Sequence, residues 1–278
     1  MILDKLGWFG KPPPGDCRKI ILHYHLFKNA GSSIDHILRE NFGEGRWHSE
    51  EFPRPTNTAA ILTGRSNAQL VQDWLAGHPE VLVLSSHTAV MPLPKLPATR
   101  VFPIIMVRNP VIRLQSSYLF QRKRFESGFH NRTTTLAGQN DLAGYLRGLL
   151  EMKRQSMARN FSSVRLAAAV PGSPDRLRQR AFKALKLLPF VGVVELFDQS
   201  MHALERWLAP HFPGFQVLPA WQNASDRSSE SLSDRLAGIR EAIGGDLYRE
   251  LLAANRIDLD IHRAASREIV RAAGTQMS

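Results

Sequence analysis

Cysteine is nearly absent from this chain of 278 residues: Cys17 is the single one, so no disulfide can form within the chain. That composition is typical of a protein in a reducing compartment. The sequence also lacks any uninterrupted apolar run of the roughly 18 to 20 residues that a membrane-spanning helix requires. Residues 1–15 lack the apolar centre of a signal peptide. We therefore expect a cytoplasmic protein without a membrane span.

Acidic residues are scarce relative to basic ones: 25 Asp and Glu stand against 36 Lys and Arg, a formal net charge of +11. Such a charge attracts polyanions, whereas a scattered basic surface that only maintains solubility is the alternative. No zinc-ligand spacing, basic heptad helix or aromatic-and-basic RNA motif accompanies it, so we expect no nucleic-acid partner and assign no metal ligands. A non-catalytic binder of nucleic acid or other polyanions is nevertheless the competing function.

The first motif is a strand, a short turn and a helix. Residues 19–26 alternate in polarity as a strand does, and helical apolar spacing begins directly after the turn. We predict that Ser32 caps this helix and that Asp35 completes a capping box. Backbone amides and the positive helix end at such a turn favour phosphate, although an ordinary strand-to-helix turn also prefers Gly and Ser. Because Lys28 precedes Gly31, the turn is not a Walker A loop.

Two further predicted strands end in polar side chains. Residues 81–84 form an apolar run that stops just before His87, and residues 101–107 lead into Arg108. We predict that Asn109 caps the following helix, with a proline at its first position. Ligands of open parallel α/β sheets bind at the carboxyl ends of the strands. These side chains and the first turn are therefore expected to share one edge.

The remaining chain completes an α/β pattern. We expect a loop or insertion over 42–66 and helices over 67–76 and 139–188. A last strand over 190–194 follows, and then a helix that Asp198 caps. A connector over 209–230 leads to short C-terminal helices. Alternating strands and helices predict a parallel sheet flanked by helices, with a helical C-terminal part. We expect a single domain over 1–278, with its core at 19–208.

Taken together, the two turns resemble the carbohydrate-sulfating branch of the sulfotransferases that use 3′-phosphoadenosine-5′-phosphosulfate (PAPS). The first family motif, approximately His-Ile-Pro-Lys-Thr-Gly-Gly-Thr-Ser, corresponds here to His25-Leu-Phe-Lys28-Asn-Ala-Gly31-Ser32-Ser33. The second corresponds to Arg108-Asn109-Pro110-Val111-Ile-Arg113-Leu-Gln-Ser116-Ser117-Tyr118. Phe27 replaces the usual proline and Ala30 the first glycine, and alanine has fewer backbone angles available than glycine. The resemblance, weaker further on, covers most of residues 19–208 and implies a P-loop-like sheet.

The resemblance implies roles for individual residues. The 5′-phosphosulfate would be held by the first turn, namely by Lys28, Asn29, Gly31, Ser32 and Ser33. Arg108 and Ser116 would hold the 3′-phosphate, and arginine suits this because its fork binds phosphate bidentately. Lys28 would stabilise the leaving oxygen as sulfuryl passes from PAPS to a hydroxyl of a glycan-like acceptor. No metal is expected for this reaction.

The general base is expected to be His87, because it follows a strand on the same edge and the family has a histidine after the corresponding strand. A structural or merely exposed loop histidine is the alternative. His23 and His25 share one face of the first strand and are expected to pack or to form hydrogen bonds. Glu195 could orient a residue of the site or serve structure alone. A nucleotide kinase fits less well, because the Walker A lysine is missing.

Overall fold

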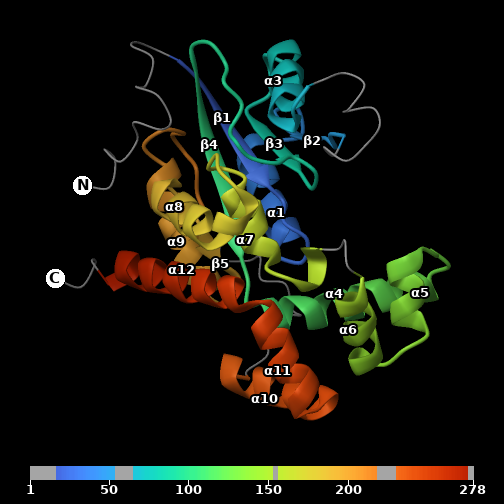
Figure 1. The fold of residues 1–278 in the computed structure, drawn as a ribbon. Helices are drawn as coiled ribbons and strands as arrows, with labels where there is room; N and C mark the ends of the chain where they lie inside the picture. The colour runs from blue at the N-terminus through green and yellow to red at the C-terminus, as the bar shows by residue number, and fades with distance from the viewer. Residues whose placement is uncertain (1–16, 54–64, 153–155, 218–229, 275–278) are drawn as a thin grey trace.

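The computed structural model describes residues 17–53, 65–152, 156–217 and 230–274 and contains a five-stranded parallel sheet flanked by helices (Figure 1). The predicted α/β fold class is confirmed. The strands are paired in the order β2-β3-β1-β4-β5, and every pairing is parallel. Their bounds are β1 (Arg18–Tyr24), β2 (Trp47–Ser49), β3 (Val83–Ser86), β4 (Thr99–Val107) and β5 (Gly192–Val193).

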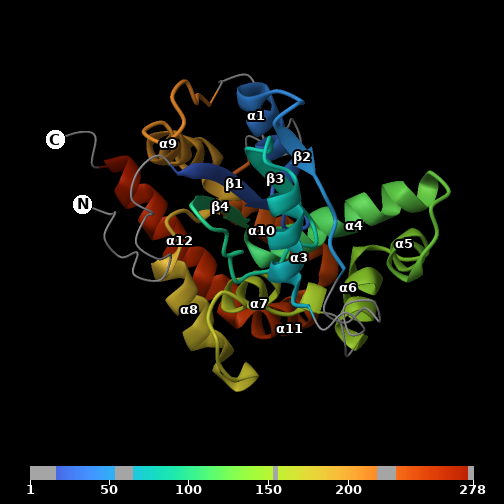
Figure 2. The same cartoon turned by 90° about the horizontal axis from the view of Figure 1, so that it is seen from above.

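Helices cover both faces of the sheet (Figure 2). Alternate residues of β1 enter different apolar clusters: Ile20 and Leu22 pack on one side and Ile21 on the other. The side of Ile21 is covered by α1 (Gly31–Phe42) and α9 (Phe197–Leu208). The opposite side is covered by α3 (Asn67–Gly77), α7 (Phe161–Ala167), α8 (Leu177–Leu187) and α12 (Arg256–Gly274). His23 and His25 have the parity of Ile21, so they face α1.

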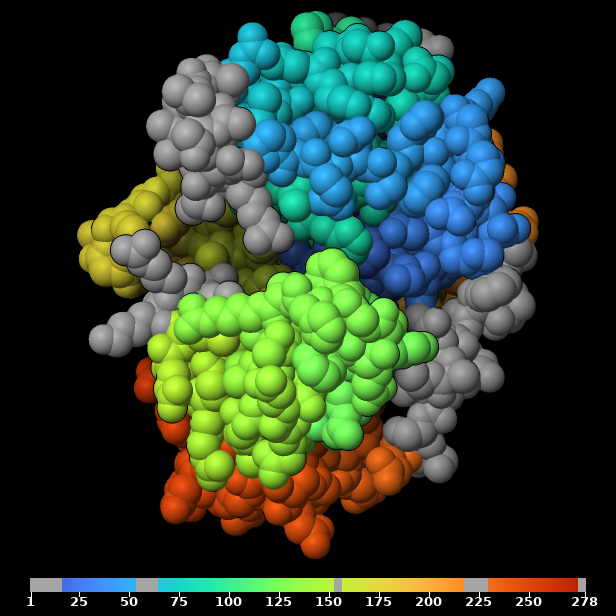
Figure 3. Space-filling view, turned by 90° about the vertical axis from the view of Figure 1, so that its right-hand side faces the viewer, coloured from blue at the N-terminus to red at the C-terminus, as the bar shows by residue number. Residues whose placement is uncertain are grey.

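A second group of helices packs around its own apolar cluster, beyond the carboxyl ends of the strands (Figure 1). It consists of α4 (Pro110–Glu126), α5 (Arg132–Gly138), α6 (Leu142–Glu151), α10 (Leu232–Ile243) and α11 (Gly245–Ala254). In Figure 3 the surface is hollowed where the blue and teal segments meet the green helices. None of the helices in the described ranges is long and apolar enough to cross a membrane.

The C-terminal helix α12 is joined to α7 by reciprocal capping. The Asp258 carboxylate accepts hydrogen bonds from the backbone amides of Ser162 (2.9 Å) and Ser163 (2.7 Å) at the start of α7. In return, Asn160 Oδ1 accepts from the amides of Ile257 (3.0 Å) and Asp258 at the start of α12. Each side chain thereby satisfies helix-end amides that lack an intrahelical partner. This pairing fixes the position of α12, which carries His262.

Four local predictions are wrong. The helices α1 and α9 begin at Gly31 and Phe197 without a side-chain cap, so neither Ser32 nor Asp198 caps its helix. The segment predicted as a loop contains the short edge strand β2. The last strand is only β5, and a 3-10 turn (Val194–Leu196) follows it. Residues 54–64 and 218–229, parts of the predicted insertion and connector, lie outside the described residues.

Candidate functional site at the carboxyl edge of the sheet

The carboxyl edge of the sheet collects the polar residues that the sequence singled out. The first turn follows β1, His87 follows β3, Arg108 follows β4 and Glu195 follows β5. Parallel pairing places these strand ends at one edge, as predicted. The Asn109 side chain caps α4 by accepting hydrogen bonds from the amides of Val111 and Ile112, and Pro110 is the first residue of that helix. That cap prediction is confirmed.

The backbone of the first turn alternates in handedness. Lys28 and Ala30 have positive φ angles of 62° and 59°, whereas Asn29 and Gly31 do not. Left-handed backbone next to right-handed backbone points N–H groups into one concavity, the geometry of anion-binding nests, but the Asn29 amide here donates to the carbonyl of Leu26 at 3.1 Å. A residue with a Cβ atom pays about 1–2 kcal/mol for the left-handed region. Ala30 therefore holds a left-handed backbone with a strain that glycine would avoid.

The start of α1 adds further donors to this concavity. Ser33 N and Ile34 N both bond to the carbonyl of Ala30. Within the described part of the chain, the amides of Gly31 and Ser32 make no hydrogen bond. Ser32 is exposed and its side chain does not cap the helix. Amides at the positive end of a helix are suited to an anion.

Asn29 points away from this concavity. Its side chain is buried, and Nδ2 donates to the carbonyl of Met106 at the end of β4 (2.8 Å). In this conformation Asn29 anchors the turn to the sheet. Its contribution to an anion site would come through the backbone.

Arg108 joins the two turns. Its guanidinium is buried, and Nη1 donates to the carbonyl of Lys28 at 3.0 Å. Arg108 Nε forms an ion pair with Glu195 Oε1 at 3.9 Å, and this oxygen accepts a hydrogen bond from the amide of Asn109 (3.1 Å). The other oxygen of Glu195 is 2.8 Å from His262 Nε2 on α12. Glu195 therefore orients the second turn, and the C-terminal helix supports the site.

Lys28 reaches toward α4. Its Nζ lies 4.7 Å from the ring centroid of Phe120, and the Phe27 ring meets Phe120 edge-on. Ser116 is half-buried on α4, four residues before Phe120 and so on the same helix face. The structure thus brings the lysine of the first motif close to the helix of the second.

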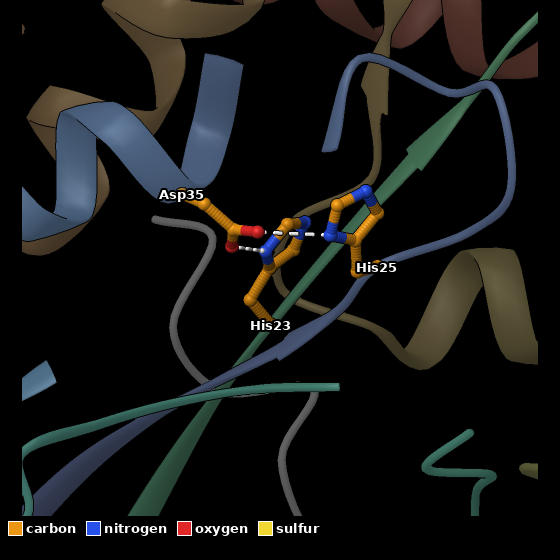
Figure 4. A group of neighbouring side chains, drawn as sticks. All are labelled: His23, His25 and Asp35. Atoms are coloured by element: carbon orange, nitrogen blue, oxygen red, sulfur yellow. Dashed lines mark hydrogen bonds and ion pairs between the residues drawn. The ribbon is translucent and has the colours of Figure 1, made fainter. Parts of the chain in front are cut away.

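Behind the turn, one carboxylate holds two histidines (Figure 4). Asp35 Oδ1 is 2.7 Å from His23 Nδ1, and Asp35 Oδ2 is 2.8 Å from His25 Nδ1. Burial opposes the charge on Asp35, but the hydrogen bonds from both imidazoles outweigh it and hold its pKa well below the usual range. Asp35 is therefore an ionised acceptor, and both Nδ1 atoms carry a proton. The hydrogen-bonding role expected for these histidines is confirmed.

Among the described residues, His23, His25 and Asp35 form the one group whose ligand atoms lie close enough to hold a metal ion, within 4.8 Å of one another. The observed separations of 2.7 and 2.8 Å are those of hydrogen bonds between imidazole and carboxylate. We therefore interpret the group as a hydrogen-bonded cluster. The expectation of no metal site stays a prediction.

His87 contacts this cluster from the neighbouring strand. Its ring centroid is 3.7 Å from that of His25, and its Nδ1 lies 3.3 Å from the His25 carbonyl. Glu51 fixes the loop by accepting from the amide of His87. His87 is exposed overall, but its imidazole is partly buried against the protein. This burial and the charge of His25 lower the pKa of the His87 imidazole, whereas the charge of Glu51 raises it. Because Nδ1 faces a carbonyl, Nε2 is the nitrogen that can accept a proton.

Three contributors were not found from the sequence. Asp35 was interpreted as part of a helix cap, although its spacing from Gly31 places both on one face of α1. His262 lies in a C-terminal helix without a recognisable motif. Phe120 lies between the second motif and the basic residues 122–124, and nothing in the sequence distinguishes it from a packing residue.

A side chain at Gly31 is expected to disrupt the cluster. A Cβ atom there would lie 1.8 Å from His25 Cδ2 and 2.0 Å from Nε2, so the imidazole would have to move. We expect Gly31→Ala to lower the free energy of unfolding by about 1–3 kcal/mol, as overpacking does. Urea denaturation measures this.

The matched control is Gly238→Ala on α10, where a Cβ atom would meet nothing within 4 Å. That substitution should be neutral or stabilising, since alanine is the better helix former. Combined with His25→Ala, the Gly31→Ala cost should shrink, because the clashing ring is gone. Equal costs with and without the His25 ring would show that the clash is not the cause.

Fold and site define a parallel α/β protein whose basic and histidine side chains gather at the carboxyl edge of the sheet. The chain is 33% identical over 247 residues to an uncharacterized protein of Archaeoglobus fulgidus. The aligned region covers 87% of this chain and 94% of the archaeal protein. The chain belongs to the same protein family as that archaeal protein. No family model matches the chain.

Proposed function

We propose that this protein is a PAPS-dependent sulfotransferase that sulfates a hydroxyl of a glycan or glycoconjugate. One observation carries the proposal: the turn of residues 28–31, with left-handed backbone at Lys28 and Ala30, lies beside the buried Arg108, whose guanidinium donates to the Lys28 carbonyl. A lysine, a nest and an arginine at one sheet edge suit a ligand with two separated phosphate groups. The two sequence motifs support the same assignment.

The residues of the first turn fit the 5′-phosphosulfate. The nest amides and the start of α1 would bind its oxygens, while Lys28 Nζ neutralises charge on the oxygen that leaves. For the 3′-phosphate we propose Arg108 together with Ser116. Glu195 is a positioning residue, because it accepts from the Asn109 amide and lies beside Arg108.

The transfer requires removal of one proton. PAPS supplies the sulfuryl group, and the products are a sulfate ester and adenosine 3′,5′-bisphosphate. As the acceptor oxygen bonds to sulfur and the bond from sulfur to the 5′-phosphate oxygen breaks, His87 Nε2 takes the acceptor's proton. The lowered pKa keeps His87 neutral and able to accept near neutral pH.

Thermal unfolding with adenosine 3′,5′-bisphosphate tests the cofactor site. At 100 times its dissociation constant the ligand should stabilise the protein by about 2.7 kcal/mol. Adenosine 5′-monophosphate, which lacks the 3′-phosphate, should bind more weakly. In Arg108→Ala the bisphosphate should stabilise the protein no more than the monophosphate does. Each shift in melting temperature is measured relative to the same variant without ligand.

Arg122→Ala is the control, since Arg122 is an exposed arginine of α4 that should leave the bisphosphate shift unchanged. Two results would overturn the proposed cofactor site. One is no stabilisation of the native sequence by bisphosphate. The other is an undiminished preference for bisphosphate in Arg108→Ala.

A further inference from the structure

His25 lies between a fixed carboxylate and the first turn. Its side chain is 11% exposed, and Nδ1 donates to Asp35 Oδ2. The opposite edge of the ring, which carries Nε2, lies against Gly31 at the start of α1. In Figure 4 this second nitrogen points away from Asp35. The imidazole thus presents one nitrogen to an ionised acid and the other to the place where the proposed function puts an anion.

We propose that His25 is a ligand of the bound anion and that it acts as the imidazolium, with Nδ1–H on Asp35 and Nε2–H on a phosphate or sulfate oxygen. This inference rests on the proposed function and adds a residue to its site. A fully ionised phosphate or sulfate oxygen can only accept hydrogen bonds. Since Nδ1 is already protonated, contact through Nε2 requires a second proton on the ring.

Anion binding is therefore coupled to uptake of a proton by His25. The charged and titratable groups next to the ring come from several elements: His23 from β1, Asp35 from α1, and His87 after β3, whose own amide donates to Glu51. Asp35 is the anion bonded directly to the ring, so it is the positioning residue that stabilises the imidazolium. A positive His25 in turn keeps its neighbour His87 unprotonated. The two neighbouring histidines then have different roles, His25 as the anion ligand and His87 as the base.

Calorimetry with adenosine 3′,5′-bisphosphate at pH 8, in buffers of different ionisation enthalpy, counts the protons exchanged. At this pH the phosphates are already doubly ionised, since their second pKa is about 6. We expect the native protein to take up nearly one proton per ligand. Its dissociation constant should rise with pH, by at most about tenfold per pH unit, the limit for one linked proton.

Variants identify the residue that takes up the proton when the ligand binds. His25→Gln should bind with almost no uptake, and Asp35→Asn should show reduced uptake and weaker binding. His87→Gln should keep the uptake, as should His202→Gln, which alters an exposed histidine of α9. Tight binding by the native protein without proton uptake overturns the inference and leaves the proposed function standing. Unchanged uptake in His25→Gln does the same, whereas a protein that binds neither bisphosphate nor pyrophosphate overturns both.

Discussion

Replacing Lys28 by methionine is expected to lower the rate of sulfuryl transfer by about 10²–10³-fold, the effect of removing one preorganised charge stabiliser. Methionine keeps an unbranched apolar side chain, so the contact with Phe120 is largely retained while the charge is lost. Because Lys28 acts on charge that develops during the reaction, affinity for the bisphosphate product should change much less than the rate.

The rate can be measured before the acceptor is known. Release of adenosine 3′,5′-bisphosphate from PAPS with water as acceptor depends on the same leaving group, so it should fall by the same factor in Lys28→Met. Lys28→Arg keeps the charge but replaces a compact ammonium by a planar fork, and should recover part of the rate. Lys123→Met, at an exposed lysine of α4, is the control. Similar rates in Lys28→Met and Lys123→Met would remove Lys28 from the reaction.

The parts of the fold that could be predicted are those with long, regular patterns. The strand before the first turn, the strand before Arg108 and the helix capped by Asn109 are all present. β2 and β5 have only three and two residues, too few for alternation to be distinguished from a loop. Their places are set by β3 and β4, the strands with which they pair.

The site was predicted as separate motifs, and the structure supplies the links between them. The sequence placed Lys28 and Arg108 at one edge, but it could not show that the guanidinium of Arg108 bonds to the carbonyl of Lys28. Asp35 follows Ser32 at the spacing of a capping box, and this local pattern predicted a helix cap where the structure has contacts to distant residues. In the structure the helix begins after the left-handed Ala30 without a side-chain cap, and Asp35 bonds instead to His23 and His25.

His262 shows why the remainder of the site could not be predicted. It reaches Glu195 only because Asp258 and Asn160 lock the C-terminal helix to α7. Those contacts join residues almost a hundred positions apart, and no periodicity in the sequence reports them. Sequence motifs thus identified groups that approach a ligand, whereas the groups that orient them depend on the assembled fold.

Replacing His87 by alanine is expected to lower transfer to the acceptor by at least about 100-fold, the lower range for loss of a general base. Binding of bisphosphate should survive, because His87 follows β3 and contacts the site through His25 rather than through the first turn. The measurement is transfer of labelled sulfate from PAPS to the acceptor that a glycan panel identifies. Release of bisphosphate into water should fall less, which separates His87 from Lys28.

The dependence of the transfer rate on pH also tests the assignment of His87 as the general base. The neutral imidazole is the active form, so the rate at saturating PAPS should rise with pH and level off above the pKa of His87. Burial and the charge of His25 lower that pKa, so the midpoint should lie below the ordinary histidine value of about 6.5. In His25→Gln the neighbouring charge is absent and the midpoint should move upward. A midpoint above the ordinary value, or near-normal transfer by His87→Ala, would assign the proton to another group.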